Sequence, residues 1–208
     1  MVSNIIIATL VGFLFAHHAF ADTALKGILT AQPQIMMKDG KVDGCGVRII
    51  GMEETTSMDA RVSNFDVSFA LYANGIAGLK GLALDDVSMR DVAKAKAAGK
   101  TLSLKYVPLE SFWIKSPVNS ATTPINGKVL SGENRLSLLY VASFPLVAEL
   151  FQPVFDQTTI QVGIKRKSDK VGYIYFGVPM MSKEELKQLS MCIDEFKSNL
   201  TSEEPLRK

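Results

Sequence analysis

Residues 64–71 show the clearest pattern along the chain, a strict alternation of apolar with polar or small side chains. The apolar positions are Phe65, Val67, Phe69 and Leu71. A period of two is typical of a β-strand that buries one face. The turn signal Asn74-Gly75 follows, and a second strand-like segment occupies 76–84, so this region predicts a β-hairpin.

Two further hairpins are predicted from patterns of the same kind. Residues 34–52 contain the turn signal Asp39-Gly40 between two apolar segments. Residues 158–166 and 171–178 are strand-like and flank a short polar connection. Single strands are predicted at 101–106, 109–114 and 136–141, with Pro108 interrupting the first two. A long polar loop is expected at 116–127.

Three segments have helical character. The first covers 86–98, and the second, which prolines bound on both sides, covers 143–153. The third is a C-terminal amphipathic helix, which a capping box at Ser182 and Glu185 begins and which runs to about Asn199. Each helix is short except the last.

The order of these elements predicts the fold class. Strands mostly follow strands, which favours an α+β fold of mostly antiparallel strands over a βαβ fold. We expect hairpins in a sandwich-like or open sheet, with the C-terminal amphipathic helix and one or two short helices. The chain length fits a single globular domain, which we place at 22–200, followed by a polar tail at 201–208.

The N-terminal segment has the features of a signal peptide. Residues 5–16 form an apolar run, and Ala19-Phe20-Ala21 provides a cleavage signal. A run of about 12 residues is shorter than the roughly 20 that a membrane-spanning helix needs. We therefore expect residues 1–21 to be removed and the mature protein to be exported, to the periplasm or the extracellular space, without an integral membrane segment. A bacterial periplasmic location is the favoured interpretation.

Cysteine usage fits this compartment. The two cysteines, Cys45 and Cys192, lie near opposite ends of the predicted domain, and such a pair in an exported chain is typical of a structural disulfide. Cys192 also falls at the edge of the apolar stripe of the C-terminal helix. We therefore predict a disulfide between these residues, with two free thiols or an intermolecular bond as alternatives.

Removal of the signal peptide also limits the available chemistry. Both histidines, His17 and His18, lie inside it, so the mature domain contains no imidazole. A Ser-His-Asp or Cys-His nucleophile and most zinc sites depend on imidazole or on several thiolates. We therefore predict no metal and no cofactor. The net charge of +2 at pH 7 gives no reason to expect nucleic acid as a partner.

Two features are candidates for contact with a partner. A basic cluster at the predicted tip of the last hairpin consists of Lys165, Arg166, Lys167 and Lys170. Such a cluster can contact phosphate or an acidic surface, while a solvated turn is the simpler interpretation. Trp113, the sole tryptophan, is either an exposed anchor for a partner or a sugar, or a core residue.

Three glycines, Gly75, Gly78 and Gly81, repeat at a spacing of three residues. This spacing differs from the G-x-G-x-x-G pattern of dinucleotide-binding folds. We interpret these glycines as parts of turns and bulges in a strand.

The methionine pair Met36-Met37 is interpreted as filling the core, because adjacent residues of a strand point to opposite faces and cannot chelate together.

These observations predict a non-enzymatic exported domain that binds another protein, an envelope component or a small ligand, with its oligomeric state open. One alternative is a carboxylate-dependent hydrolase, which needs two acidic side chains in one cleft. Its candidate residues are Asp66, Asp85, Asp86, Glu110 and Glu133. The other alternative is a carrier of a small apolar ligand, held in an enclosed cavity between the sheet and a helix.

Overall fold

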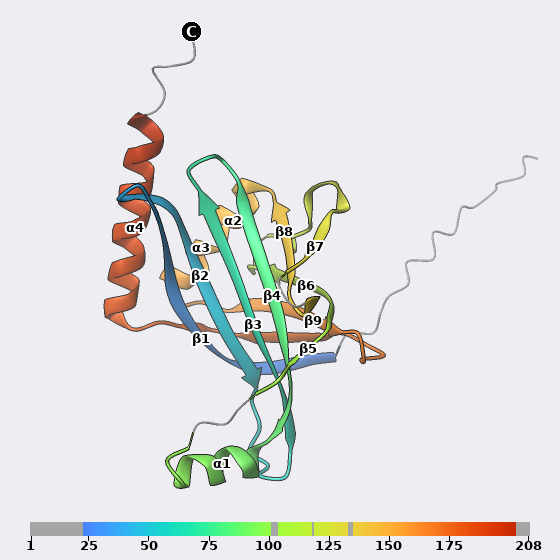
Figure 1. Cartoon of the computed structure of the whole chain (residues 1–208). Helices are drawn as coiled ribbons and strands as arrows, with labels where there is room; N and C mark the ends of the chain where they lie inside the picture. Colours follow the sequence, from blue (N-terminus) through green and yellow to red (C-terminus); the bar gives the residue numbers. More distant parts are fainter. Residues whose placement is uncertain (1–22, 101–103, 118, 133–134, 203–208) are drawn as a thin grey trace, which may run out of the picture.

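One strongly curved β-sheet dominates the fold, and the helices that follow residue 143 pack on one of its faces (Figure 1). The computed structural model describes residues 23–100, 104–117, 119–132 and 135–202. The predicted signal peptide, residues 1–21, lies outside the described residues. Neighbouring strands are mostly antiparallel, which confirms the predicted α+β fold.

The strands and helices are as follows. The strands are β1 (Thr23–Lys38), β2 (Lys41–Glu53), β3 (Arg61–Tyr72), β4 (Ala77–Ser88), β5 (Tyr106–Val107), β6 (Leu109–Lys115), β7 (Val129–Ser131), β8 (Leu138–Ala142), β9 (Ile160–Arg166), β10 (Tyr173–Gly177) and β11 (Pro179–Met180). The helices are α1 (Met89–Ala97), the single 3₁₀ turn η1 (Ile125–Gly127), α2 (Phe144–Glu149), α3 (Phe151–Phe155) and α4 (Lys183–Ser202). The main path through the sheet is β6-β9-β10-β1-β2-β3-β4-β8-β7.

Strand β1 joins the two halves of this sheet. It pairs with β2 in antiparallel register from Gly27 to Lys38, and its first residues pair in parallel with β10. Asp39 and Gly40 form the turn between β1 and β2 with φ values of 52° and 78°, as a two-residue hairpin turn of type I′ requires. The predicted hairpin is confirmed. The first half of β1 was not predicted, because Gly27 and Pro33 interrupt its apolar pattern.

The hydrophobic core lies between one face of the central strands and the helices. Buried side chains of this face include Ala31, Val47, Ile49, Phe65, Val67, Phe69 and Leu79. The helical side chains in the same core include Val147, Phe151, Val154, Leu189 and Phe196. Because burial of apolar surface is the main favourable term in folding, this layer fixes the central strands against α2, α3 and α4.

The predicted helix at 143–153 is two short helices in the structure. Helix α2 ends at Glu149 and α3 begins at Phe151, so Pro153 lies inside α3 and does not end a helix. The boundary was misplaced because the first turn of a helix leaves its N–H groups without partners, and proline is therefore tolerated there. Strand β7 was also not predicted, since three residues are too short to show a period.

The predicted strand at 101–106 is present only in part. Strand β5 begins at Tyr106 and is two residues long, while residues 101–103 lie outside the described residues. Pro108 separates β5 from β6, as expected from its missing N–H. The loop at 116–127 is also confirmed as a connection, with η1 at its end.

Helix α4 begins with the predicted capping box. The N–H of Ser182 donates to Glu185 Oε2 at 2.8 Å, and the N–H of Glu185 donates to Ser182 Oγ at 3.2 Å. The helix continues to Ser202 and thus into the predicted tail. Over the described part of the chain, no helix has the length and apolar character that crossing a membrane would require.

Candidate functional site

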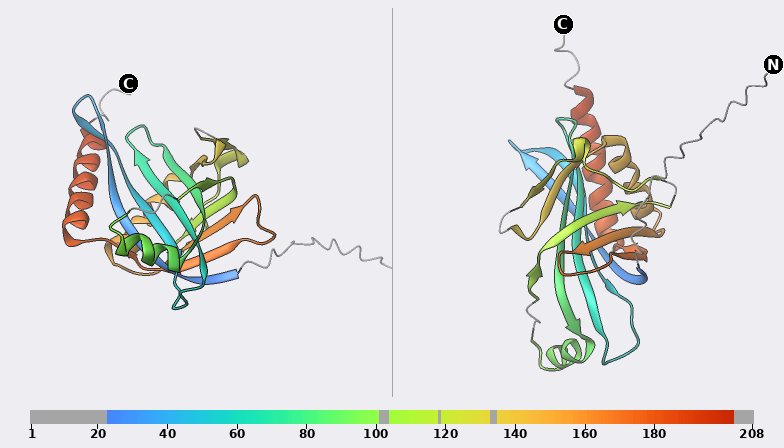
Figure 2. Two further views of the ribbon diagram at one scale, coloured as in Figure 1. Left: turned by 60° about the horizontal axis from the view of Figure 1, so that its bottom comes forward. Right: turned by 90° about the vertical axis from the view of Figure 1, so that its right-hand side faces the viewer.

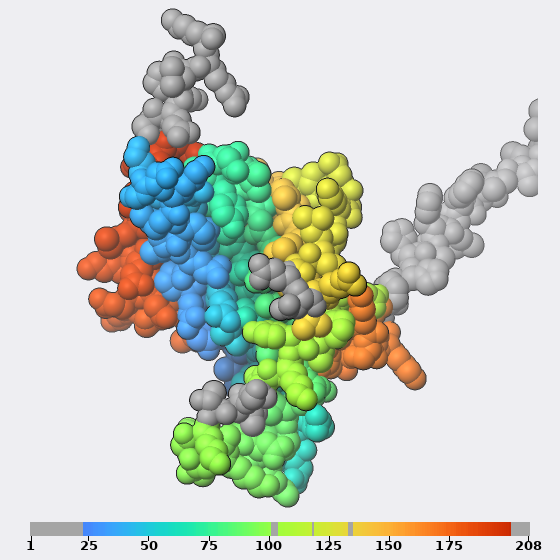
Figure 3. All heavy atoms as spheres, in the orientation of Figure 1, coloured from blue at the N-terminus to red at the C-terminus, as the bar shows by residue number. Residues whose placement is uncertain are grey.

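The central strands give the sheet two different faces. One face carries the core and is covered by α2, α3 and α4, while the other faces away from these helices (Figure 2). Cys45 belongs to the covered face, and its neighbours Gly44 and Gly46 belong to the uncovered face because side chains alternate along a strand. Figure 3 shows the uncovered face, with β3 and β4 set between the β1–β2 hairpin and β7.

Small residues form a low floor across the uncovered face. Gly46 of β2 lies beside Ala70 of β3, and Ala70 lies beside Gly78 of β4. Gln34 of β1 and Val141 of β8 end this row. Because the three central positions carry at most a methyl group, the surface is hollowed there. This hollow, which we call the trough, has a volume of about 870 Å³.

Larger side chains surround the floor of the trough. Met36 and Tyr72 line the side nearest the hairpin turns, where Met36 was expected to fill the core. A Cβ atom at Gly44 would lie 3.0 Å from the ring of Tyr72, and one at Gly78 would lie 3.3 Å from it. Toward β7 the trough is lined by Ile125, Asn126, Lys128, Leu130 and Leu139. The lining is mainly apolar, and the trough is open to solvent.

A smaller polar pocket of about 290 Å³ adjoins the trough. Its lining consists of Gln34, Arg48, Asp66, Ser68, Lys80, Leu82 and Tyr106, of which Gln34, Ser68 and Lys80 also line the trough. Lys80 is exposed, and within the described residues it forms no ion pair. The polar pocket therefore presents a free cation to solvent beside an apolar surface.

Arg48 and Asp66 form the main interaction in the polar pocket. Arg48 Nε lies 3.0 and 3.1 Å from the two carboxylate oxygens of Asp66, and Arg48 Nη2 lies 2.6 Å from Oδ2. The hydrogen bonds that Arg48 donates to this carboxylate raise the pKa of Arg48, against the opposing effect of partial burial. Asp66 is buried, so the ion pair balances a carboxylate charge that would otherwise be costly.

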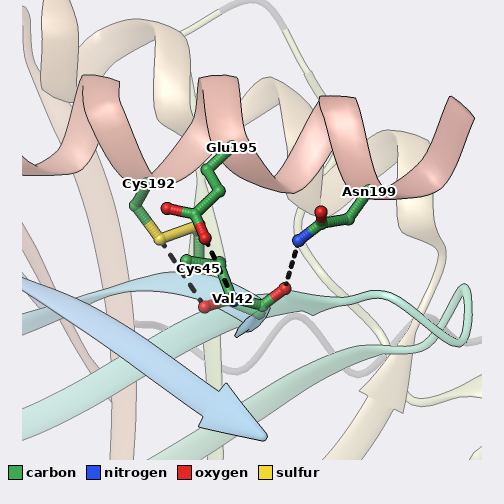
Figure 4. Close-up of a disulfide and its surroundings, with 6 residues drawn as sticks. Val42, Cys45, Cys192, Glu195 and Asn199 are labelled. Carbon is green, nitrogen blue, oxygen red and sulfur yellow. Dashed lines mark hydrogen bonds between the residues drawn. A yellow bond between two sulfur atoms is a disulfide. The ribbon is translucent and has the colours of Figure 1, made fainter. Parts of the chain in front are cut away.

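The predicted disulfide between Cys45 and Cys192 is confirmed, and it attaches α4 to β2 (Figure 4). The two Cα atoms lie 6.0 Å apart, a normal separation for a disulfide. Val42 adds two contacts nearby, because its N–H donates to Glu195 Oε1 at 3.4 Å and its carbonyl accepts from Asn199 Nδ2 at 3.0 Å. Strand β2 is thus fixed to the helix on one face and forms part of the trough floor on the other.

Arg166, from the predicted basic cluster, is buried in the structure. Its guanidinium donates to the carboxylates of Asp86 and Asp169. Burial would lower the pKa of Arg166, but the hydrogen bonds to Asp86 and Asp169 outweigh burial and raise it. This residue therefore joins β9 to β4 inside the fold and is not available on a projecting surface.

The other basic residues of that cluster lie closer to solvent. Lys165 Nζ pairs with Glu110 Oε1 of β6 at 2.9 Å. Lys167 and Lys170 are exposed in the connection between β9 and β10. The structure thus divides the cluster, with two lysines in a solvated turn and the remaining two residues in ion pairs between strands.

Trp113 is half-buried and lies across a glycine of the neighbouring strand. A Cβ atom at Gly163 would lie 2.1 Å from the indole ring, which shows how closely the ring approaches the β9 backbone. The ring and Gly163 both border a shallow pocket of about 200 Å³, separate in lining from the trough. Trp113 therefore packs across β9 at Gly163.

The carboxylates considered for a hydrolase are engaged by different partners. Three of them are held in the ion pairs Asp66–Arg48, Asp86–Arg166 and Glu110–Lys165. Asp85 is exposed, and Glu133 lies outside the described residues. Catalysis by two carboxylates requires both groups in one cleft. The three paired carboxylates instead belong to β3, β4 and β6, each with its own basic side chain.

The space between the sheet and α4, where the carrier alternative would place an apolar ligand, is occupied by side chains. Leu189, Cys192 and Phe196 of α4 are buried against the sheet. The trough lies on the opposite face, and the sequence did not predict it as a site, although Met36 and Gly78 of its lining were considered for other roles. Gly78 was interpreted as part of a turn or bulge, yet it lies inside β4 and forms the floor. Only the register between strands shows that Gly46, Ala70 and Gly78 are neighbours.

Comparison with known proteins finds no match to this chain among protein-family models, curated proteins or solved structures. The trough, the adjoining polar pocket and the chemistry of the residues that line them are therefore the features that indicate a function.

Proposed function

We propose that this protein is an exported, non-enzymatic binding domain that carries an elongated, mainly apolar ligand in the trough. The observation that carries this proposal is the row of Gly46, Ala70 and Gly78, which hollows the uncovered face of the sheet. A hollow of about 870 Å³ falls within the range of about 300–1,000 Å³ that is common for ligand sites.

The shape of the trough favours a single chain. Its floor crosses from β1 to β8 over four interstrand spacings of about 4.8 Å, which gives a length of about 19 Å. The neighbouring rows of larger side chains lie two residues away along each strand, at about 7 Å on either side. One of these rows contains Met36 and Tyr72, and the other contains Arg48 and Lys80. A long and narrow floor of this kind fits one extended hydrocarbon chain.

The apolar lining supplies the driving force for such a ligand. Met36, Leu130, Leu139 and Val141 are apolar, and Leu130 and Val141 are substantially exposed. Covering exposed apolar surface contributes about 25 cal/mol per Å². Ligand binding would therefore shield side chains that now contact water, and it requires no change in the packed core on the other face.

Export and the absence of imidazole from the predicted mature chain support a binding role over catalysis. With His17 and His18 in the signal peptide, the usual base for nucleophilic catalysis is missing. The described residues that line the trough include two lysines and no carboxylate. The disulfide agrees with folding in an oxidising compartment.

The proposal can be tested by titrating the mature, oxidised protein, labelled with ¹³C at its methionine methyl groups, with sodium dodecanoate and separately with dodecanol. We expect the Met36 resonance to shift in a saturable way with at least one probe. Met191 is exposed on α4, far from the trough lining, so its resonance serves as an internal control. Absence of any saturable shift at Met36 would contradict the proposal.

A matched pair of variants locates the site. Gly78→Val places a branched side chain on the trough floor, whereas Thr30→Leu adds apolar volume to an exposed position of β1 outside the lining. We expect Gly78→Val to weaken binding about tenfold or more, since steric overlap of this kind costs about 1–3 kcal/mol. Thr30→Leu should bind as the unchanged protein does. Ala70→Leu provides a second variant of the trough floor. If Gly78→Val and Ala70→Leu both fold and both bind the probe as tightly as the unchanged protein does, the ligand binds elsewhere.

A further inference from the structure

We infer that the polar pocket beside the trough is a head-group site for an acidic oxyanion, so that the ligand is a single-chain amphiphile with a carboxylate or phosphate head. This inference rests on the proposed function of the trough. It adds the chemical class of the ligand and the residues that recognise its head group.

Arg48 is held in a position from which it can bind an anion. Asp66 accepts from Nε and from one N–H of Nη2, which leaves three of the five guanidinium N–H donors free of partners within the described part of the chain. The side chain of Arg48 is 39% exposed and that of Asp66 is 9% exposed. The buried carboxylate of Asp66 therefore orients the more exposed guanidinium of Arg48, and the remaining N–H donors are left for a ligand in the pocket.

The charge of the pocket favours an anion. Arg48 and Lys80 carry positive charge, and Asp66 is its one acidic lining residue among those described. Because Asp66 is already paired with Arg48, the charge of Lys80 is left uncompensated. Ser68 and Tyr106 add hydroxyl groups that can donate to an oxyanion. Charge-assisted hydrogen bonds of this type are the strong ones in ligand recognition.

The register places this pocket directly beside the apolar floor. Arg48 lies opposite Ser68, and Ser68 lies opposite Lys80, so these three residues form a row across β2, β3 and β4. Each of them is two residues along its strand from Gly46, Ala70 or Gly78, a distance of about 7 Å. A head group in the polar row can therefore be joined to a chain that lies on the small-residue floor.

The inference is tested with four probes of twelve carbon atoms each: dodecanoate, dodecyl phosphate, dodecanol and dodecylamine. Affinities are measured by calorimetry on the mature, oxidised protein below the micelle concentration of each probe. We expect the two acids to bind about tenfold or more tightly than dodecanol, as one or two charge-assisted hydrogen bonds predict. Dodecylamine should bind most weakly. Whichever of the two acids binds more tightly identifies the head group as carboxylate or phosphate.

Variants assign the preference to the polar pocket. Lys80→Gln should reduce affinity for the acids about tenfold more than affinity for dodecanol, because Lys80 lines the trough as well as the polar pocket. Lys41→Gln, at an exposed position outside both linings, should alter neither. The double variant Arg48→Gln with Asp66→Asn removes the guanidinium without leaving a buried carboxylate unpaired. It should bring the affinities for acid and alcohol close together.

The outcomes separate this inference from the proposed function. Equal binding of dodecanoate, dodecanol and dodecylamine, with no effect of Lys80→Gln, would overturn the head-group site and leave the trough as a site for apolar chains. Tighter binding of the amine would also overturn it. If no probe binds, the proposed function itself fails.

Discussion

Cys45 and Gly46 are adjacent in β2 and face opposite sides of the sheet: Cys45 is bonded to Cys192 of α4, and Gly46 forms part of the trough floor. Each face of the strand therefore has a separate task. On the covered face, Cys45 attaches the C-terminal helix. On the uncovered face, Gly46 has no side chain and therefore leaves the trough floor open. Because both tasks fall on one strand, the fixed position of β2 also fixes the shape of the trough.

Removing the disulfide should destabilise the protein substantially. The bond closes a segment with a sequence separation of 147 residues, for which chain entropy allows a loss of at most about 4–5 kcal/mol in the Cys45→Ala/Cys192→Ala double variant. Urea unfolding monitored by circular dichroism measures this loss. Reduction of the unchanged protein should lower the unfolding midpoint in the same direction. Equal midpoints for oxidised and reduced protein would contradict a structural role for the bond.

Two glycines of the trough floor should respond differently to the same substitution. A Cβ atom at Gly46 would lie 2.5 Å from the carbonyl oxygen of Phe69, whereas one at Gly78 would meet only the Tyr72 ring at 3.3 Å. We expect Gly46→Ala to cost about 1–3 kcal/mol, since backbone must move to relieve the overlap. Gly78→Ala should stay within about 0.5 kcal/mol of the unchanged protein. Chemical denaturation of the two variants compares them directly, and similar stabilities would show that the sheet adapts at Gly46.

Arg166 should be far more sensitive to substitution than its neighbour Lys167. Arg166→Met leaves the carboxylates of Asp86 and Asp169 without their cation, and breaking a buried ion pair in this way costs about 3–5 kcal/mol. Lys167→Met removes an exposed charge and should change stability by less than about 0.5 kcal/mol. Thermal unfolding of the two variants, measured by calorimetry, distinguishes these expected losses of stability. A mild effect at Arg166 would mean that water replaces its hydrogen bonds.

Tyr140 should make the protein sensitive to alkali. Burial raises the pKa of Tyr140 to about 12, although the hydrogen bond with Thr122 Oγ1 lowers it in part. In the unfolded chain a tyrosine ionises near pH 10. The contribution of Tyr140 to stability is therefore complete below about pH 10 and is lost as the pH rises through about 12, because only the unfolded state releases the proton in that interval.

The measurement is the unfolding free energy as a function of pH between neutral and alkaline values. Tyr140→Phe should cost about 1–2 kcal/mol at neutral pH through the lost hydrogen bond, and its stability should fall less steeply in alkali. Tyr106→Phe, at an exposed tyrosine, is the control and should follow the unchanged protein. If Tyr140→Phe and the unchanged protein show parallel curves, Tyr140 does not hold its proton in the folded state.

Local patterns were sufficient for the elements that depend on neighbours in sequence. The alternation around Phe65, the Asp39-Gly40 turn and the Ser182–Glu185 capping box each depend on residues a few positions apart, and each is present in the structure. The pairing of Cys45 with Cys192 was also predictable, because two cysteines allow only one intramolecular bond.

The trough and the polar pocket required the tertiary structure. Gly46, Ala70 and Gly78 lie on three strands, and only the register of those strands places them in one row. Arg48 and Asp66 meet for the same reason, diagonally across two strands.

The sequence by itself therefore determined the α+β character, the hairpin turns and the disulfide, since these follow from local periods and from a single possible pairing. The tertiary structure decided which face is left uncovered, where small side chains line up, and that Arg166 is buried. Those features depend on how strands far apart in the chain align with one another, and no local period carries that information.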